Sequence, residues 1–200
     1  MTPAPSLPTS AEAGRLRAVR EYGVLEAPRD PVLDGFAALA AHICGTPMAF
    51  ITLITEDRQV IKAAHGLALS DGPRSHSFCG HAILASDEPF LVPDATADPR
   101  FEGIPAVADR PGIRAYGAVA LVTPSGHAIG TLCVADRVPR TLGDHHLRAL
   151  RMLSSQVMGH LEIRRALRQS QLRFELMSHS ADAVVWDWDI ENDAFWWSDT

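Results

Sequence analysis

The stretch that most constrains the fold is 48–55, MAFITLIT. It is apolar at odd and even positions alike and rich in β-branched and aromatic residues, which is typical of a central strand buried on both faces. Two further apolar runs, 114–123 and 127–136, predict long strands. The link between them, 124–126, ends in glycine, which suits a hairpin loop that needs a positive φ. The sequence therefore predicts an antiparallel sheet with a buried central strand and a late hairpin.

Two short helices are predicted before the central strand. Ser10 is the expected N-cap of the first, and Gly23 stands where a left-handed residue would end it. Asp30 followed by Pro31 is a second start signal, because Asp caps a helix and Pro is tolerated at its first position. Apolar residues three and four apart then continue to Gly45, where the second helix is expected to end.

A third helix is much longer. It is predicted to run from about 143 to 178, and its first half carries apolar residues three or four apart: Leu147, Leu150, Leu153, Val157 and Leu161. A helix that extends beyond its own domain is suited to be a dimer seam or a connecting rod. We expect its apolar row to hold two copies of the chain together.

The middle of the chain is irregular. A second strand is predicted at 58–65, and then glycines and prolines interrupt short apolar runs throughout 66–108. Within this segment we expect a small helix at 79–86, a short strand at 90–93, and loops.

Composition excludes several classes of protein. The chain has 200 residues, 46% of them hydrophobic, which is enough for a packed core. Its 18 basic and 24 acidic residues give a net charge of -6, and no Lys or Arg block suggests a nucleic acid or an anionic membrane as partner. Residues 1–14 resemble neither a signal peptide nor a membrane anchor and are predicted to be a disordered leader. Three widely spaced cysteines, Cys44, Cys79 and Cys133, are expected to be reduced thiols in the cytoplasm.

The end of the chain has a different character. The runs VVWDWDI and AFWWS flank a polar turn and contain all four tryptophans. Two strands cannot bury that much aromatic surface by themselves, so they are predicted to open a second domain.

Several stretches together carry a family resemblance: EYGVLEAP, SFCGHAI, FLVPDATADPRF, GIRAYGAVAL and GTLCVADRVPR. From Arg17 to about Arg168 the chain resembles a bacterial GAF domain of the kind found at the front of sensor proteins. The tail from about Leu172 looks like the opening of a PAS domain. The domain plan is then a leader at 1–14, a GAF domain at 15–165, a helical linker at 166–180 and a truncated PAS domain at 181–200.

The resemblance implies an α+β fold with a central antiparallel sheet. The first and last helices are expected on one face and a small-molecule pocket on the other, roofed by the irregular segment. The implied role is sensing: the long helix would relay pocket occupancy to the PAS domain and to an output module, a sensor histidine kinase or a diguanylate cyclase. The 200-residue chain itself is not expected to be an enzyme. Family members often have Phe where Ala115 stands, so the pocket is expected to be enlarged there or a partner residue shifted.

The stretch 75–83, SHSFCGHAI, gathers His76, Cys79 and His81. These residues supply at most three metal ligands without a paired CxxC spacing, so we predict no metal site. Catalysis by Cys79 with His81 as base is disfavoured, because residues two apart on a helix point away from each other. Phytochromes place His directly after the cysteine that holds the bilin, whereas Gly80 intervenes here, so a covalent bilin is not expected either.

The favoured interpretation of this stretch is the roof of a pocket. Ser77 is expected to cap the small helix, and Phe78 to face the sheet as core. His81 either lines the cavity or is a satisfied core histidine. Arg114 is expected to pair with Asp98, while Gly130 inside a strand predicts a bulge or a close backbone approach. The ligand and any cofactor are not identified by the sequence, and the candidate pocket residues are Phe78, Cys79, His81, Asp94, Asp98, Arg100, Arg114 and Tyr116.

Two other functions remain open. One is a thiol-based redox sensor or reductase that uses Cys79 with Cys44 or Cys133, for which a low-pKa thiol would be the mark. The other is a dimerisation module without a ligand, in which the domain serves only to present the long helix.

Overall fold

A computed structural model describes residues 9–67, 70–84, 86–101, 103–180, 186–189 and 194–197. The chain divides into two compact units, residues 1–161 and 162–200. The first unit contains a six-stranded sheet, and the second contains the end of the long helix and a two-stranded sheet.

The six-stranded sheet is antiparallel throughout, with the order β3-β2-β1-β6-β5-β4. Its strands are β1 Met48–Ile54, β2 Arg58–His65, β3 Gly72–Pro73, β4 Phe90–Val92, β5 Ala115–Val122 and β6 Ala128–Asp136. The central place of β1 and the β5–β6 hairpin confirm the two strongest predictions from the sequence. Gly126 in the hairpin loop has φ 82°, the backbone region that glycine favours.

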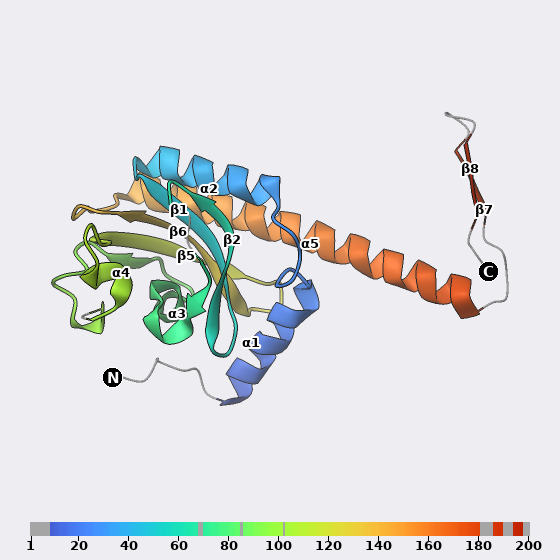
Figure 1. The fold of residues 1–200 in the computed structure, drawn as a ribbon, viewed down its shortest axis with the longest axis horizontal. Helices are drawn as coiled ribbons and strands as arrows, with labels where there is room; N and C mark the ends of the chain where they lie inside the picture. The colour runs from blue at the N-terminus through green and yellow to red at the C-terminus, as the bar shows by residue number, and fades with distance from the viewer. Residues whose placement is uncertain are drawn as a thin grey trace. The chain divides into compact units, whose positions relative to one another are not determined.

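Five α-helices and two 3₁₀ turns accompany the strands in the described part of the chain (Figure 1). They are α1 Thr9–Tyr22, α2 Pro31–Cys44, η1 Arg74–His76, α3 Phe78–Ala82, η2 Pro99–Phe101, α4 Pro105–Ala108 and α5 Asp144–Ser180. The start of α2 is as predicted: the Asp30 side chain accepts from the Val32 amide, and Pro31 occupies the first turn. Because α1 begins at Thr9, the predicted leader does not reach residue 14, and residues 1–8 lie outside the described part.

The sheet separates two hydrophobic cores. Side chains of a strand alternate between its faces. On one face, Ile51 and Leu132 belong to a helix-side core with residues of α1, α2 and α5. On the other, Phe50 and Cys133 belong to a pocket-side core with α3 and α4. Figure 1 shows α2 and α5 over one face and α3 and α4 on the other, which confirms the α+β architecture that the family resemblance implies.

Ala115 lies on the helix side of this arrangement, contrary to expectation. Its strand neighbour Tyr116 belongs to the pocket-side core, and alternation along β5 therefore turns Ala115 to the opposite face. A small residue at this position does not enlarge the pocket.

The long helix α5 has 37 residues, as the sequence pattern predicted. Its first apolar row is not a dimer seam, however. Leu150, Val157 and Leu161 are at most 1% exposed and pack in the helix-side core of their own domain. The Ser154 hydroxyl, 2.8 Å from the carbonyl oxygen of Ala120, donates a hydrogen bond that ties α5 to β5.

Two local predictions need adjustment. The small helix predicted at 79–86 ends at Ala82, and Asp87 and Pro89 follow in a segment that favours turns. At Gly130 both alternatives hold. Residue 129 is the extra residue of a bulge in the β5–β6 ladder, and an added Cβ at Gly130 would lie 1.9 Å from the Thr52 carbonyl oxygen.

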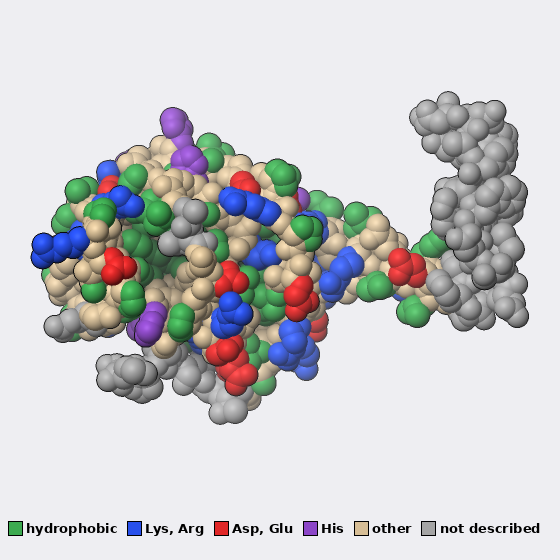
Figure 2. All heavy atoms as spheres, viewed as in Figure 1, with side chains coloured by type: hydrophobic (Ala, Val, Ile, Leu, Met, Phe, Trp, Pro, Cys, Tyr) green, Lys and Arg blue, Asp and Glu red, His purple; other side chains and the backbone are tan. Residues whose placement is uncertain are grey.

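The second unit contains the strands β7 Trp186–Asp189 and β8 Ala194–Trp197, which pair antiparallel. Their membership of a PAS domain remains a prediction, and the rest of 181–200 lies outside the described residues. Among the described helices, none is long and apolar enough to cross a membrane. Basic and acidic side chains are interspersed on the face of the molecule shown in Figure 2.

Candidate functional site

A small cavity of about 70 Å³ lies between the pocket-side face of the sheet and the irregular segment above it. The sheet contributes side chains from β1, β2, β5 and β6, and the roof contributes 76–79 and α4. The lining comprises Phe50, Thr52, Gln59, His76, Ser77, Phe78, Cys79, Ala106, Ile113, Tyr116, Cys133 and Ala135. The predicted roof over a sheet is therefore present in the described residues, and it encloses a small space.

The roof is held by a helix cap and by aromatic stacking. The Ser77 hydroxyl accepts from the Gly80 amide at 3.0 Å, which is the predicted N-cap of α3, and it also donates to the side-chain oxygen of Gln59 on β2. The Phe78 ring stacks on those of Phe101 and Tyr116, with centroids 4.3 Å and 4.8 Å away. These contacts fix 77–79 directly above the strands.

A cluster of two thiols and a phenol lies where the roof meets the sheet: Cys79 from α3, Tyr116 from β5 and Cys133 from β6. Cys79 Sγ lies 3.1 Å from Tyr116 Oη and 4.0 Å from Cys133 Sγ. Beside this cysteine-tyrosine cluster, the hydroxyls of Thr52 and Thr131 are hydrogen-bonded at 3.0 Å. Sulfur and hydroxyl groups from the roof and the sheet therefore gather within an otherwise apolar core.

The two thiols differ in acidity. Burial raises the pKa of Cys79, but hydrogen bonds from Cys133, from the two threonines and from Tyr116 favour its thiolate and bring its pKa below the ordinary value. The hydrogen bond to Cys79, followed by burial, raises the pKa of Cys133 well above the ordinary value. Burial likewise raises the pKa of Tyr116, so its hydroxyl remains a donor. Of the pair, Cys79 is the thiol that ionises first.

The third thiol lies in the other core. Cys44 ends α2 and packs on the helix side of the sheet. Burial raises its pKa to about 11, against a smaller opposing effect of Arg140. Cys44 is therefore neither close to Cys79 nor made more acidic. Of the two possible partners that the sequence left open, Cys133 is the one that lies beside Cys79.

The structure places three of the eight predicted pocket residues, Phe78, Cys79 and Tyr116, in the described lining of the cavity. His81 is half-buried with its ring edge against Phe101, and burial lowers its pKa. Cys79 thus faces Tyr116 and Cys133 rather than His81, as the helical spacing indicated.

The four charged candidates lie elsewhere. Asp94 accepts from the amide and hydroxyl of Thr96, and these bonds lower its pKa. Asp98 pairs with Arg100, with 2.6 Å between Oδ2 and Nη2. Arg114 instead donates to the carbonyls of Val107 and Ile113. The predicted pairing of Arg114 with Asp98 is wrong, because Arg100, two residues along the turn, already takes both oxygens of that carboxylate.

Sequence reasoning missed Thr52 and Thr131 as parts of this site, and it named Cys133 only as one of two possible thiol partners of Cys79. A signal for the threonines was present, because each is the one polar residue inside a strand that is otherwise apolar or glycine until its last residue. A buried hydroxyl needs a partner, so two such residues on strands that pair suggest a shared hydrogen bond. Thr52 and Thr131 are indeed opposite each other in the β1–β6 register.

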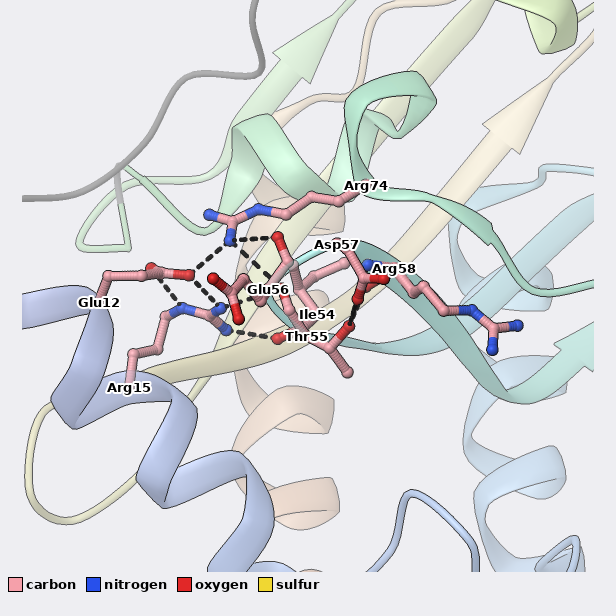
Figure 3. Close-up of polar contacts among 8 residues, drawn as sticks. All are labelled: Glu12, Arg15, Ile54, Thr55, Glu56, Asp57, Arg58 and Arg74. Carbon is pink, nitrogen blue, oxygen red and sulfur yellow. Dashed lines mark hydrogen bonds and ion pairs between the residues drawn. The ribbon is translucent and has the colours of Figure 1, made fainter. Parts of the chain in front are cut away.

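A second buried polar cluster joins α1 to η1, the turn that precedes the roof helix α3 (Figure 3). Glu12 pairs with Arg15 at 2.7 Å and with Arg74 at 2.5 Å. Arg15 also donates to the Ile54 carbonyl, and Arg74 to that of Thr55, at the end of β1. The two guanidinium groups, with Arg15 contributing most, lower the pKa of Glu12 to about 2 against the opposing effect of burial. The Glu12–Arg15–Arg74 cluster therefore fixes α1, β1 and η1 together.

A larger groove of about 430 Å³ lies along β2, with Lys62, Ala63 and Asp71 in its wall. It borders residues 68 and 69, which lie outside the described part, and Lys62 already donates to the carbonyls of Leu25 and Ala27. Within the described residues, no group of three or more His, Cys, Asp or Glu is placed to hold a metal ion. The cavity beneath the roof is the better candidate, because both the roof and the sheet contribute to it.

The comparisons with known proteins agree with this architecture. The model of the GAF domain family matches residues 28–161, and the chain belongs to this family. The "Cyclic di-GMP phosphodiesterase PA2567" of Pseudomonas aeruginosa is 37% identical over 156 residues, which are 78% of this chain and 26% of that protein. The chain thus spans about a quarter of that relative.

Solved structures share the fold at low sequence identity. The GAF domain of an Acinetobacter phosphoenolpyruvate-protein phosphotransferase has a TM-score of 0.57 at 16% identity, covering 82% of this chain and 99% of that one. A free methionine-R-sulfoxide reductase from Neisseria meningitidis has a TM-score of 0.56 at 20% identity, covering 81% and 96%. These likenesses show the fold alone.

Proposed function

We propose that this GAF domain is the input module of a larger signalling protein and that it binds a small, uncharged molecule in the cavity between the roof and the sheet. The observation that carries the proposal is the cavity itself, which lies between the irregular segment and the sheet of a GAF fold. None of its described lining residues is Asp, Glu, Lys or Arg. An ion would lose its hydration there without gaining an opposite charge, which favours a neutral ligand.

The size of the cavity also limits the ligand. A volume of about 70 Å³ corresponds to roughly two waters at their liquid share of space. A ligand with more than a few heavy atoms therefore requires the roof to lift. The Ser77 cap and the bond to Gln59 are the contacts that such a movement would strain.

The relay to α5 is proposed to run through the strands. Cys133 faces the cavity, while its neighbours Leu132 and Val134 pack in the helix-side core with α5. The Ser154 hydrogen bond to Ala120 adds a polar contact between α5 and β5. Occupancy of the cavity would then favour one of two packings of α5 on the sheet.

The rest of the parent protein is proposed from the chain's context. We propose a cytoplasmic protein in which α5 leads to a PAS domain and then to a histidine kinase or a diguanylate cyclase. The relative named as a cyclic di-GMP phosphodiesterase supports an output that acts on cyclic di-GMP more than a kinase. We further propose that two copies associate through the exposed part of α5.

The binding test uses two alanines of α4. Ala106 lines the cavity and is half-buried, whereas Ala108 is exposed on the same helix. The purified chain is mixed with the uncharged small-molecule fraction of a bacterial extract and analysed by native mass spectrometry and by its absorbance spectrum. We expect a bound molecule with the wild type and with Ala108→Leu, and at least about tenfold weaker binding with Ala106→Leu, which fills the cavity.

Two results would contradict the proposal. Equal binding by both variants would place the ligand elsewhere. Failure of the wild type to bind anything, with a stable dimer present, would favour the alternative of a dimerisation module without a ligand.

A further inference from the structure

We propose that the cavity also admits hydrogen peroxide and that Cys79 and Cys133 react with it to form a reversible disulfide between the roof and the sheet. The reaction requires no other ligand, so it stands apart from the sensing role proposed above. It makes the cysteine-tyrosine cluster a site of oxidation.

The geometry selects this pair among the three thiols. Cys79 Sγ and Cys133 Sγ are 4.0 Å apart, and a disulfide requires about 2 Å, so the sulfurs must approach each other by about 2 Å. Cys79 belongs to the short helix α3 of the roof, whereas Cys133 is in the central strand β6. Cys44 lies in the helix-side core, with the sheet between it and the pair.

The cavity provides a route for a small oxidant. Cys79 and Cys133 are 3% and 1% exposed, so bulk solvent does not reach them directly. Both line the cavity, together with the exposed His76 and the half-buried Gln59 at its outer side. A cavity of about 70 Å³ admits hydrogen peroxide, which has two heavy atoms.

The chemistry assigns different roles to the two thiols. The Tyr116 hydroxyl, 3.1 Å from Cys79 Sγ, is placed to stabilise a thiolate there. Because this hydroxyl lies against Cys79, Cys79 is the attacking group and Cys133 the resolving one.

The step balances with peroxide as the only oxidant. The Cys79 thiolate attacks one oxygen; an S–O bond forms, the O–O bond breaks, and the departing hydroxide leaves as water with the proton that Cys79 had given up. The Cys133 thiol then attacks the Cys79 sulfenic acid; the S–S bond forms, the S–O bond breaks, and a second water leaves with the Cys133 proton. The two sulfurs lose two electrons, which reduce the peroxide, and an external dithiol reverses the reaction.

The test follows thiols and mass in the full chain. After exposure to hydrogen peroxide, we expect the wild type to lose two of its three alkylatable thiols and the mass of two hydrogens. A digest without reductant should contain one peptide pair joined through Cys79 and Cys133, and dithiothreitol should restore both thiols.

Single variants assign the roles. Cys44→Ala, outside the cluster, should behave as the wild type. In Cys133→Ala the reaction should stop at a sulfenic acid on Cys79, which dimedone traps. In Cys79→Ala, peroxide should oxidise Cys133 at least about tenfold more slowly than it oxidises Cys79 in the wild type. Circular dichroism checks that each variant is folded.

The wild type alone is sufficient to overturn the proposal. It fails if all three thiols remain alkylatable in denaturant after peroxide treatment, or if the disulfide formed contains Cys44 or joins two chains. Neither result depends on whether the cavity binds a metabolite, so the sensing proposal is judged separately.

Discussion

The Glu12–Arg15–Arg74 cluster concentrates charge in a small buried volume. Arg15 is 1% exposed, and Glu12 compensates both guanidinium groups with one carboxylate. Carbonyls at the end of β1 accept further hydrogen bonds from both arginines. Removal of a single buried partner from such a group is costly, because the charges that remain cannot be rehydrated.

Glu12→Gln is therefore expected to lower the free energy of unfolding by about 3 kcal/mol at neutral pH. The wild-type contribution has a defined pH dependence. Because the folded-state pKa of Glu12 is about 2, below its ordinary 4.5, the stabilisation is fully present above pH 4.5 and is lost as the pH falls toward 2. Urea unfolding between pH 7 and pH 2 measures both effects.

Glu88→Gln is the matched control. Glu88 also pairs with an arginine, Arg151, but its side chain is 80% exposed. We expect a change below about 0.5 kcal/mol, since exposed ion pairs contribute little. Equal losses in the two variants would show that burial of the Glu12 cluster has no energetic role.

Tyr116→Phe tests the electrostatics of the cysteine-tyrosine cluster. The variant removes the hydroxyl that lies 3.1 Å from Cys79 Sγ and keeps the stacked ring. We expect the pKa of Cys79 to rise, so the midpoint of its alkylation rate against pH should move upward. Cys44 in the same sample is the internal reference. An unchanged midpoint for Cys79 would remove Tyr116 from the account of its acidity.

At the scale of elements, periodicity and capping signals predicted most of the structure. The Asp30 and Ser77 caps, the strand at 58–65 and the extent of α5 follow from local chemistry, so they were accessible without coordinates. The choice of Cys133 over Cys44 as the neighbour of Cys79 was not, because it depends on how α3 packs on β6, 54 residues away in the chain. The orientation of Ala115 likewise depends on the register of β5, which a change of one residue would reverse.

Gly130 and Gly35 predict opposite effects of the same substitution. Gly130→Ala would place a Cβ 1.9 Å from the Thr52 carbonyl oxygen, in the centre of the sheet, so we expect a loss of about 3 kcal/mol or more. In Gly35→Ala, the Cβ meets nothing within 4 Å inside α2, and we expect a gain of about 0.5–1 kcal/mol. Thermal unfolding of both variants decides the point. A stable Gly130→Ala protein would show that β1 and β6 approach each other less closely.

In the whole molecule, the exposed apolar residues of α5 are the ones through which we propose that two copies associate, in place of the buried row that the sequence suggested. Ile163 and Leu167 are 70% and 59% exposed and lie four residues apart, on one face of the helix. Both belong to the second unit, whereas the predicted row faces its own core.

The double variant Ile163→Glu with Leu167→Glu is expected to weaken the proposed dimer by at least about tenfold, because it places four carboxylates at a symmetric seam. Light scattering after gel filtration, over a range of concentrations, measures the change. Val138→Glu is the control, since Val138 is 56% exposed in the loop after β6. A dimer that survives the double variant and not the control would move the interface away from α5.

The alternation of the strands has a consequence for how new specificities arise. On β5 and β6 the side chains that face the pocket-side core are mainly alanines: Ala118, Ala120, Ala128 and Ala135. A single substitution at any of them changes the volume available in the pocket-side core, while the residues that pack against α5 in the helix-side core stay the same. Receptors built on this plan can therefore diverge in what they recognise and keep an inherited output, since selection acts on the two surfaces of the same strand separately.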